Sequence, residues 1–120
     1  MQPTGTATTK PIDVSDANFA QEVLQSPLPV LLDCWAPWCP PCRMVAPIIE
    51  ELAAELAGTI KVCKLNIDEN PDTTDRLGIQ SIPAFRLFRD GQVIGEMLGA
   101  APRERIKEFV RRRLVQPETA

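Results

Sequence analysis

The chain has 120 residues, of which 44% are hydrophobic, and this predicts one packed domain at 11–116 between flexible tails at 1–10 and 117–120. Its 13 basic and 16 acidic residues give a net charge of −3, so we expect no nucleic-acid partner. The first ten residues form no apolar run of the length that a secretory signal or a spanning helix needs, which favours a cytoplasmic protein without membrane contact.

The first half of the chain predicts a helix followed by a buried strand. Ser15 or Asp16 can cap the helix, which ends near Ser26 because the next residue is proline. Residues 29–35 follow as a short apolar run without alternation, the pattern of a strand that is covered on both faces. Asp33 is the one charged residue in this run.

A long helix, a strand and a short helix are predicted next. Between residues 40 and 57, apolar side chains recur at helical spacing, and Gly58 provides a stop signal. These side chains are Met44, Val45, Ile48, Ile49, Leu52 and Leu56. Residues 60–67 alternate as a strand, and a short helix then runs from Asn70-Pro71 to Gly78.

A hairpin and a last helix complete the predicted fold. Residues 84–89 and 92–98 flank Asp90-Gly91, a strong hairpin signal, and Pro102 starts the helix. Its apolar face carries Ile106, Phe109, Val110 and Leu114. The order is strand, helix, strand, helix, strand, helix, hairpin, helix. This order predicts an α/β fold with a mixed sheet of about five strands flanked by about four helices.

The last helix carries six of the thirteen basic residues, namely Arg103, Arg105, Lys107, Arg111, Arg112 and Arg113. Glu104 and Glu108 are interspersed among them. Because cations are favourable at the C-terminus of a helix, we interpret this stretch as a solvated helix face rather than a binding patch.

The chemistry-bearing residues are Cys39 and Cys42, which lie where the buried strand gives way to the long helix. A helix start offers free N–H groups and the positive end of the helix dipole, which favour a thiolate. Cys39 is therefore expected to be the more exposed nucleophile. Cys42 lies one turn further along the same side, where it can resolve a mixed disulfide that Cys39 forms with a substrate.

Asp33 is the second chemical group of this region. Burial raises the pKa of a carboxyl group, so that it can exchange protons near neutral pH. One hypothesis is that Asp33 takes the proton from Cys42. The alternative is a carboxylate paired with a nearby cation such as Lys64, and the two are compatible.

Several segments resemble the thioredoxin family in order and spacing. They are Leu31-Leu32-Asp33-Cys34-Trp35-Ala36-Pro37-Trp38-Cys39-Pro40-Pro41-Cys42-Arg43, Lys64-Leu65-Asn66-Ile67-Asp68, Gly78-Ile79-Gln80-Ser81-Ile82-Pro83, Phe88-Arg89-Asp90-Gly91 and Gly99. The resemblance covers residues 11 to 115. It implies the thioredoxin fold and a protein-disulfide reductase that works through a reversible Cys39–Cys42 disulfide, with Cys39 attacking and Cys42 resolving.

The resemblance also assigns roles to other residues. Asp33 would be the buried proton carrier and Lys64 its ionic neighbour. Trp38, Ile82 and Gly99 would form the docking face for protein substrates, with Pro83 as a cis proline opposite the disulfide. The sequence has no cofactor-binding fingerprint, so we expect no bound cofactor, and we also expect a monomer. Electrons must then come from a partner, which the resemblance identifies as a flavin- or ferredoxin-dependent thioredoxin reductase.

The motif departs from the usual family pattern at Pro40, where glycine is typical. Because Pro40 and Pro41 both lack an N–H, the turn is stiffer and the Cys39 thiolate has one donor fewer. We therefore expect an altered redox potential. Ser81 and Ala84 also replace residues common around the cis proline, which affects substrate pairing rather than the chemistry.

Rival functions remain at this point. A structural zinc site needs four ligands, but the chain has no histidine, and Cys34 and Cys63 lie in apolar strands. We expect these two to be small buried core residues on neighbouring strands, and a redox-sensing pair is the alternative. An oxidase or isomerase of the same fold, or one with specialised partners, is a nearer rival. The last is a redox-inert binding module.

Overall fold

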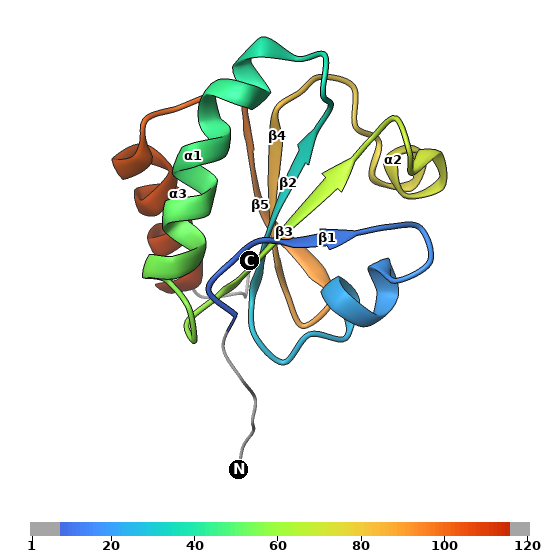
Figure 1. The fold of residues 1–120 in the computed structure, drawn as a ribbon. Coiled ribbons are helices and arrows are strands. Elements are labelled where there is room, and N and C mark those ends of the chain that lie inside the picture. Colours follow the sequence, from blue (N-terminus) through green and yellow to red (C-terminus); the bar gives the residue numbers. More distant parts are fainter. Residues whose placement is uncertain (1–7, 116–120) are drawn as a thin grey trace.

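The computed structural model describes residues 8–115, which form a five-stranded sheet with helices on both faces (Figure 1). The strands are β1 (Ile12–Val14), β2 (Val30–Trp35), β3 (Lys61–Asn66), β4 (Ala84–Arg89) and β5 (Gln92–Leu98). Their order in the sheet is β1-β3-β2-β4-β5, with β1, β3 and β2 parallel and β4 and β5 antiparallel. The predicted mixed sheet is confirmed, and the structure adds the residues of its first strand. The flexible tails predicted at 1–10 and 117–120 lie mostly outside the described residues.

Four helices flank the sheet, as predicted. They are η1 (Ala20–Leu24), a π-helical turn, α1 (Pro40–Glu55), α2 (Pro71–Leu77) and α3 (Arg103–Val115). The helices α1 and α3 lie on one side of the sheet, and α2 and η1 lie on the other (Figure 1). No helix between residues 8 and 115 combines the length and the apolar composition needed to cross a bilayer.

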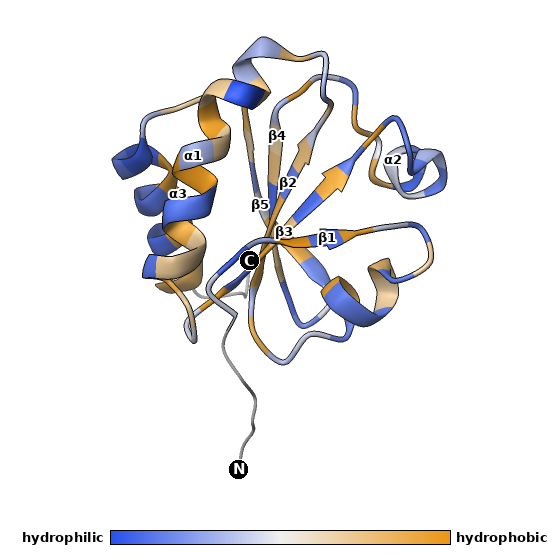
Figure 2. Ribbon diagram, in the orientation of Figure 1, coloured by the Kyte–Doolittle hydropathy of each residue, from blue (hydrophilic) through white to orange (hydrophobic). Residues whose placement is uncertain are grey.

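The core consists of two apolar layers, one on each face of the sheet. Figure 2 shows hydrophobic residues, in orange, along the strands and on α1. Leu31 of β2 packs with Ile49 of α1 on one face, whereas its neighbour Leu32 packs on the other. This explains why residues 29–35 are apolar without alternation. Met44, predicted on the apolar stripe of α1, is 73% exposed. Its neighbour Val45 is buried in the core, so Met44 lies at the solvent side of the predicted stripe.

The segment before β2 is where the capping prediction was wrong in part. Ser15 accepts a hydrogen bond from the N–H of Asn18 at 3.3 Å, but Asp16 caps a different helix. Its carboxylate accepts the N–H groups of Asp72 and Thr73 at the start of α2, at 3.3 and 2.8 Å. The pKa of Asp16 is lowered, most by a side-chain hydrogen bond with Thr73 and further by these two backbone bonds. Asp16 and the start of α2 are more than fifty residues apart in the chain, so no local sequence pattern predicts this contact.

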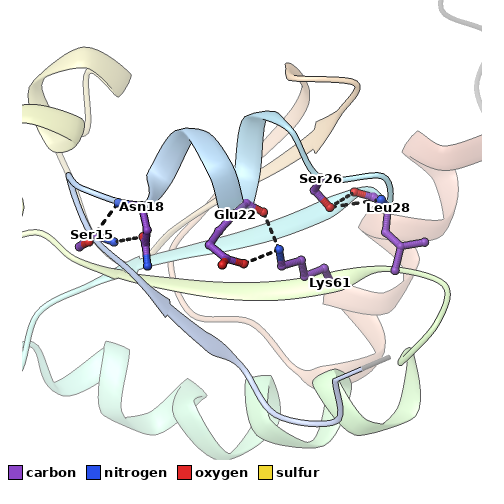
Figure 3. A network of polar contacts seen from close by, with 6 residues as sticks. All are labelled: Ser15, Asn18, Glu22, Ser26, Leu28 and Lys61. Carbon is purple, nitrogen blue, oxygen red and sulfur yellow. Dashed lines mark hydrogen bonds and ion pairs between the residues drawn. The ribbon is translucent and has the colours of Figure 1, made fainter. Parts of the chain in front are cut away.

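An ion pair fixes η1 against the sheet (Figure 3). Lys61 of β3 donates to the side chain of Glu22 at 2.6 Å and to its backbone carbonyl at 2.7 Å. Ser26, at the end of η1, bonds both the carbonyl and the N–H of Leu28. The turn that leads into β2, the central strand of the sheet, is therefore closed by polar contacts.

The cations of α3 are partly engaged with carboxylates. Arg103 pairs with Glu51 and Glu55 of α1, and Lys107 pairs with Glu55 at 2.5 Å. Because such exposed pairs contribute little each, their main effect is to orient α3 along α1.

Candidate active site

The junction of β2 and α1 positions the two cysteines of the motif. Cys39 has an extended backbone and is the N-cap of α1, with Pro40 and Pro41 as the first two helical residues. Its N–H donates to the carbonyl of Ala36 at 3.2 Å, which closes the loop after β2. Proline suits these first positions because its fixed φ matches the helix and no N–H partner is required. The predicted position of the two cysteines at a strand-to-helix junction is confirmed.

Cys39 and Cys42 form a disulfide within the first turn of α1, with Cα atoms 5.3 Å apart. The N–H of Cys42 donates to Sγ of Cys39 at 3.2 Å. Between Cys39 and Cys42, the two prolines contribute no N–H. One amide therefore supports the Cys39 sulfur from within the motif, as its composition predicts.

Cys39 was expected to be the more exposed cysteine, but in this oxidised form both cysteines are buried. The two residues are 3% and 2% exposed. They form a small buried cluster with Ala36, against which Trp35 and Ile82 pack. Because the two sulfur atoms of a disulfide are bonded to each other, the same apolar neighbours cover both.

The loop before β4 faces this disulfide. The Ile82–Pro83 peptide bond is cis, as the resemblance implied. The carbonyl oxygen of Ile82 lies 3.9 Å from Sγ of Cys39. The N–H of Gly99 donates to the carbonyl of Pro83 at 2.8 Å, and Gly99 has a φ of +85° that favours glycine. The structure thus brings Ile82, Pro83 and Gly99 together on one side of the cysteines.

Asp33 lies in the middle of β2 and is buried. Burial raises the pKa of its carboxyl to about 7, against an opposing effect of the nearby Lys64 ammonium. Its Oδ1 has no hydrogen-bond partner among the described residues. A protonated carboxyl is the stable form of such a group below neutral pH.

Lys64 is the residue opposite Asp33 on β3, but its ammonium is directed elsewhere. Among the described residues no ion pair within 4.0 Å joins Lys64 to Asp33, and Nζ lies 4.6 Å from the ring centroid of Trp35. The cation therefore acts on Asp33 through space, while a cation–π contact holds it.

Trp38, next to Cys39, and Leu98 at the end of β5 are exposed apolar residues. Trp38 is 62% exposed, and its Nε1 donates to Oδ2 of Asp68 at 2.9 Å. Leu98, next to Gly99, is 58% exposed. Sequence reasoning gave neither Asp68 nor Leu98 a role, because the pairing of an indole with a loop carboxylate leaves no pattern in the chain.

Cys34 and Cys63 are the small core residues that the sequence predicted. Both are free and buried, and both belong to the apolar layer on the η1 and α2 side. Burial raises the pKa of each thiol to about 12. In the strand register, Cys63 is opposite Leu32, so Cys34 is a diagonal neighbour, too distant for a disulfide without backbone movement.

The expectation that Pro40 costs the Cys39 thiolate a donor is wrong, because Pro40 is the first helical residue, and the donor is missing at Pro41 instead. A side chain at the N-cap accepts N–H groups of the second or third helical residue, and the second is Pro41. Pro41→Ala therefore adds a donor for the thiolate, whereas Pro40→Ala relaxes the turn equally without one. For Pro41→Ala we expect the pH midpoint of Cys39 alkylation by iodoacetamide to fall by about one pH unit. Equal midpoints in the two variants would contradict this reason.

Within residues 8–115, no group of three or more His, Cys, Asp or Glu side chains is placed to hold a metal ion. The chemistry available at the site is that of the Cys39–Cys42 pair and the buried carboxyl of Asp33.

Comparison with known proteins gives consistent matches. The family model described as Thioredoxin matches residues 10–112. A thioredoxin from Synechocystis sp. is 53% identical over 90 residues, which are 75% of this chain and 84% of that protein. Thioredoxin 1 from Nostoc sp. is 48% identical, covering 84% of this chain and 94% of the relative. Thioredoxin M4, chloroplastic, from Arabidopsis thaliana is 42% identical over 96% of this chain and 60% of its own length.

Proposed function

The chain belongs to the thioredoxin family of thiol-disulfide oxidoreductases, and we propose that Cys39 attacks and Cys42 resolves during its reduction of protein disulfides. The observation that carries these roles is the Cys39–Cys42 disulfide at the start of α1, with Sγ of Cys39 nearest the Ile82 carbonyl. The helix start and the Cys42 amide stabilise charge on the Cys39 sulfur.

The proposed reaction transfers two electrons in two exchanges. The Cys39 thiolate attacks one sulfur of the substrate disulfide, which forms a mixed disulfide and releases the other sulfur as a thiolate. Cys42 then loses its proton and attacks Sγ of Cys39. This step releases the second substrate thiolate and leaves the Cys39–Cys42 disulfide.

Asp33 is the proposed acceptor of the Cys42 proton. Its burial, its unpartnered Oδ1 and its raised pKa of about 7 support this role. A group with that pKa exchanges a proton at neutral pH at little cost. Lys64 is the proposed electrostatic neighbour that keeps the ionised form of Asp33 accessible.

Protein substrates are proposed to dock on the surface made by Trp38, Ile82, Pro83 and Gly99. The exposed indole of Trp38 offers apolar area, and the loop that carries the cis proline lies next to the disulfide. An extended substrate segment pairs with the backbone of the loop before Pro83.

Thioredoxins work with a thioredoxin reductase and with disulfide substrates, and membership of this family implies partners of these two kinds for the chain. The finer proposals are a flavin- or ferredoxin-dependent reductase, a monomeric state and a cytoplasmic location. Bacterial relatives support the last of these, although one similar protein is chloroplastic. Light scattering after size-exclusion chromatography tests the monomer.

Reduction of insulin by dithiothreitol tests the function directly. We expect catalytic amounts of the protein to accelerate precipitation of the freed insulin chain. A rate equal to that of dithiothreitol alone would favour a redox-inert binding module. Equilibration of the Cys39–Cys42 couple with glutathione separates a reductase from an oxidase, which would have a potential well above that of the cytosolic glutathione pool.

A further inference from the structure

We propose that Asp68 is a positioning residue, which holds the Trp38 indole in the orientation against which protein disulfides dock. This inference rests on the proposed reductase function and concerns the same site. It assigns a role to the loop between β3 and α2, which carries none of the reacting groups.

The contact itself is a single hydrogen bond on an exposed ring. Nε1 of Trp38 donates to Oδ2 of Asp68 at 2.9 Å, and Trp38 is 62% exposed to solvent. A ring exposed to this extent has little packing to select its rotamer. A charge-assisted bond to a carboxylate is about twice as strong as a neutral one, so this bond selects the orientation.

Asp68 can hold the ring because its own loop is held. The N–H of Asp68 donates to Oδ1 of Asn66 at 3.0 Å, and the carbonyl of Asn66 accepts from Nδ2 of Asn70 at 3.0 Å. Asn70 is buried, and its Oδ1 accepts the N–H of Asp16 at 2.9 Å. Side-chain bonds thus connect the acceptor of the indole to the interior of the fold.

The sheet register places the two partners on the same edge. Trp35 at the end of β2 is paired with Asn66 at the end of β3, and Ile67 donates its N–H to the Trp35 carbonyl at 3.0 Å. Trp38 follows three residues after Trp35, and Asp68 follows two residues after Asn66. The loop with the indole and the loop with the carboxylate therefore leave the sheet side by side.

An indole fixed before binding does not have to be ordered by the substrate. Immobilising a side chain with several rotamers weakens binding by a factor of roughly two to ten. Asp68→Ala should therefore raise KM for insulin roughly two- to tenfold while kcat changes little. The rate with hydroxyethyl disulfide, which is too small to span the docking surface, should stay the same.

Three variants separate the hydrogen bond from charge and from general effects on the loop. Asp68→Asn keeps an acceptor oxygen and loses the charge, so it should restore most of the binding. Glu69→Gln, a neighbouring exposed carboxylate, is the control and should match the parent protein. Proton exchange of the Trp38 indole N–H with water, measured by NMR, should be faster in Asp68→Ala than in Asp68→Asn.

Two outcomes would overturn the proposal: an unchanged KM and indole exchange in Asp68→Ala, or an Asp68→Asn variant as impaired as Asp68→Ala. If the parent protein itself fails to reduce insulin, the reductase function fails instead. The indole exchange then still decides whether Asp68 orients Trp38.

Discussion

Replacing Asp33 with asparagine should stabilise the protein relative to its parent by an amount that grows as the pH rises from 4 to 8. In the folded protein burial raises the pKa of Asp33 to about 7, against an ordinary value of 3.8. Between these values the unfolded chain is ionised while the folded protein keeps its proton. The folded state therefore binds more protons, and its stability falls as pH rises.

The size of this effect follows from the two pKa values. Each pKa unit corresponds to about 1.4 kcal/mol, so ionising Asp33 lowers the free energy of unfolding by about 4 kcal/mol between pH 4 and pH 8. Asparagine does not titrate, so the variant does not lose this free energy of unfolding as the pH rises. The difference between variant and parent should thus grow by about 4 kcal/mol over that range, whatever constant cost the buried amide adds.

Urea unfolding at several pH values measures this difference. Asp13→Asn makes the same chemical change at an exposed position of β1, and its difference from the parent should stay small at every pH. Parallel stability profiles for Asp33→Asn and its parent would contradict the proton-binding explanation. Such a result would also remove the basis for Asp33 as a proton acceptor near neutral pH.

The same variant connects stability with function. A carboxyl that is costly to ionise is a poor choice for a structural residue, and β2 would pack more favourably around a neutral side chain. If Asp33→Asn is more stable but resolves mixed disulfides slowly, the buried carboxyl is kept for proton transfer at the expense of stability. Resolution at the parental rate would contradict the role.

Local patterns were sufficient to predict most of the fold. The Asp90-Gly91 turn has positive φ at both residues, as a two-residue hairpin requires, and Gly78 ends α2 with a φ of +65°. The unalternating run at 29–35 correctly indicated a strand with both faces covered. Each of these features depends on neighbours in the chain or on burial averaged over a strand.

The features that were missed depend on contacts between distant segments. Asp16 has the position of a cap for the first helix, yet the tertiary structure brings it to the start of α2. Asp68 acquires its meaning only from the direction of the Trp38 indole. The charge of Lys64 acts on Asp33 as expected, but the sequence did not predict that its ammonium lies over the ring of Trp35. Sequence spacing specifies which residues share an edge, not which side chains meet there.

Replacing each active-site cysteine with serine should abolish insulin reduction in both variants but trap a mixed disulfide in only one of them. Neither Cys39→Ser nor Cys42→Ser can complete the exchange, so insulin reduction should fall to the rate of dithiothreitol alone in both. The variants differ in the intermediate. Cys42→Ser keeps the proposed nucleophile but cannot resolve it, so a mixed disulfide with the substrate should accumulate.

Intact mass measurement detects that intermediate. Cys42→Ser should gain the mass of one disulfide-linked substrate chain, which dithiothreitol removes, whereas Cys39→Ser should gain none. The double variant keeps Cys34 and Cys63 as its free thiols, both buried with pKa values raised to about 12, so it should form no adduct. An adduct on Cys39→Ser but not on Cys42→Ser would reverse the assignment. The substrate would then react with Cys42, although the Ile82 carbonyl contacts the sulfur of Cys39.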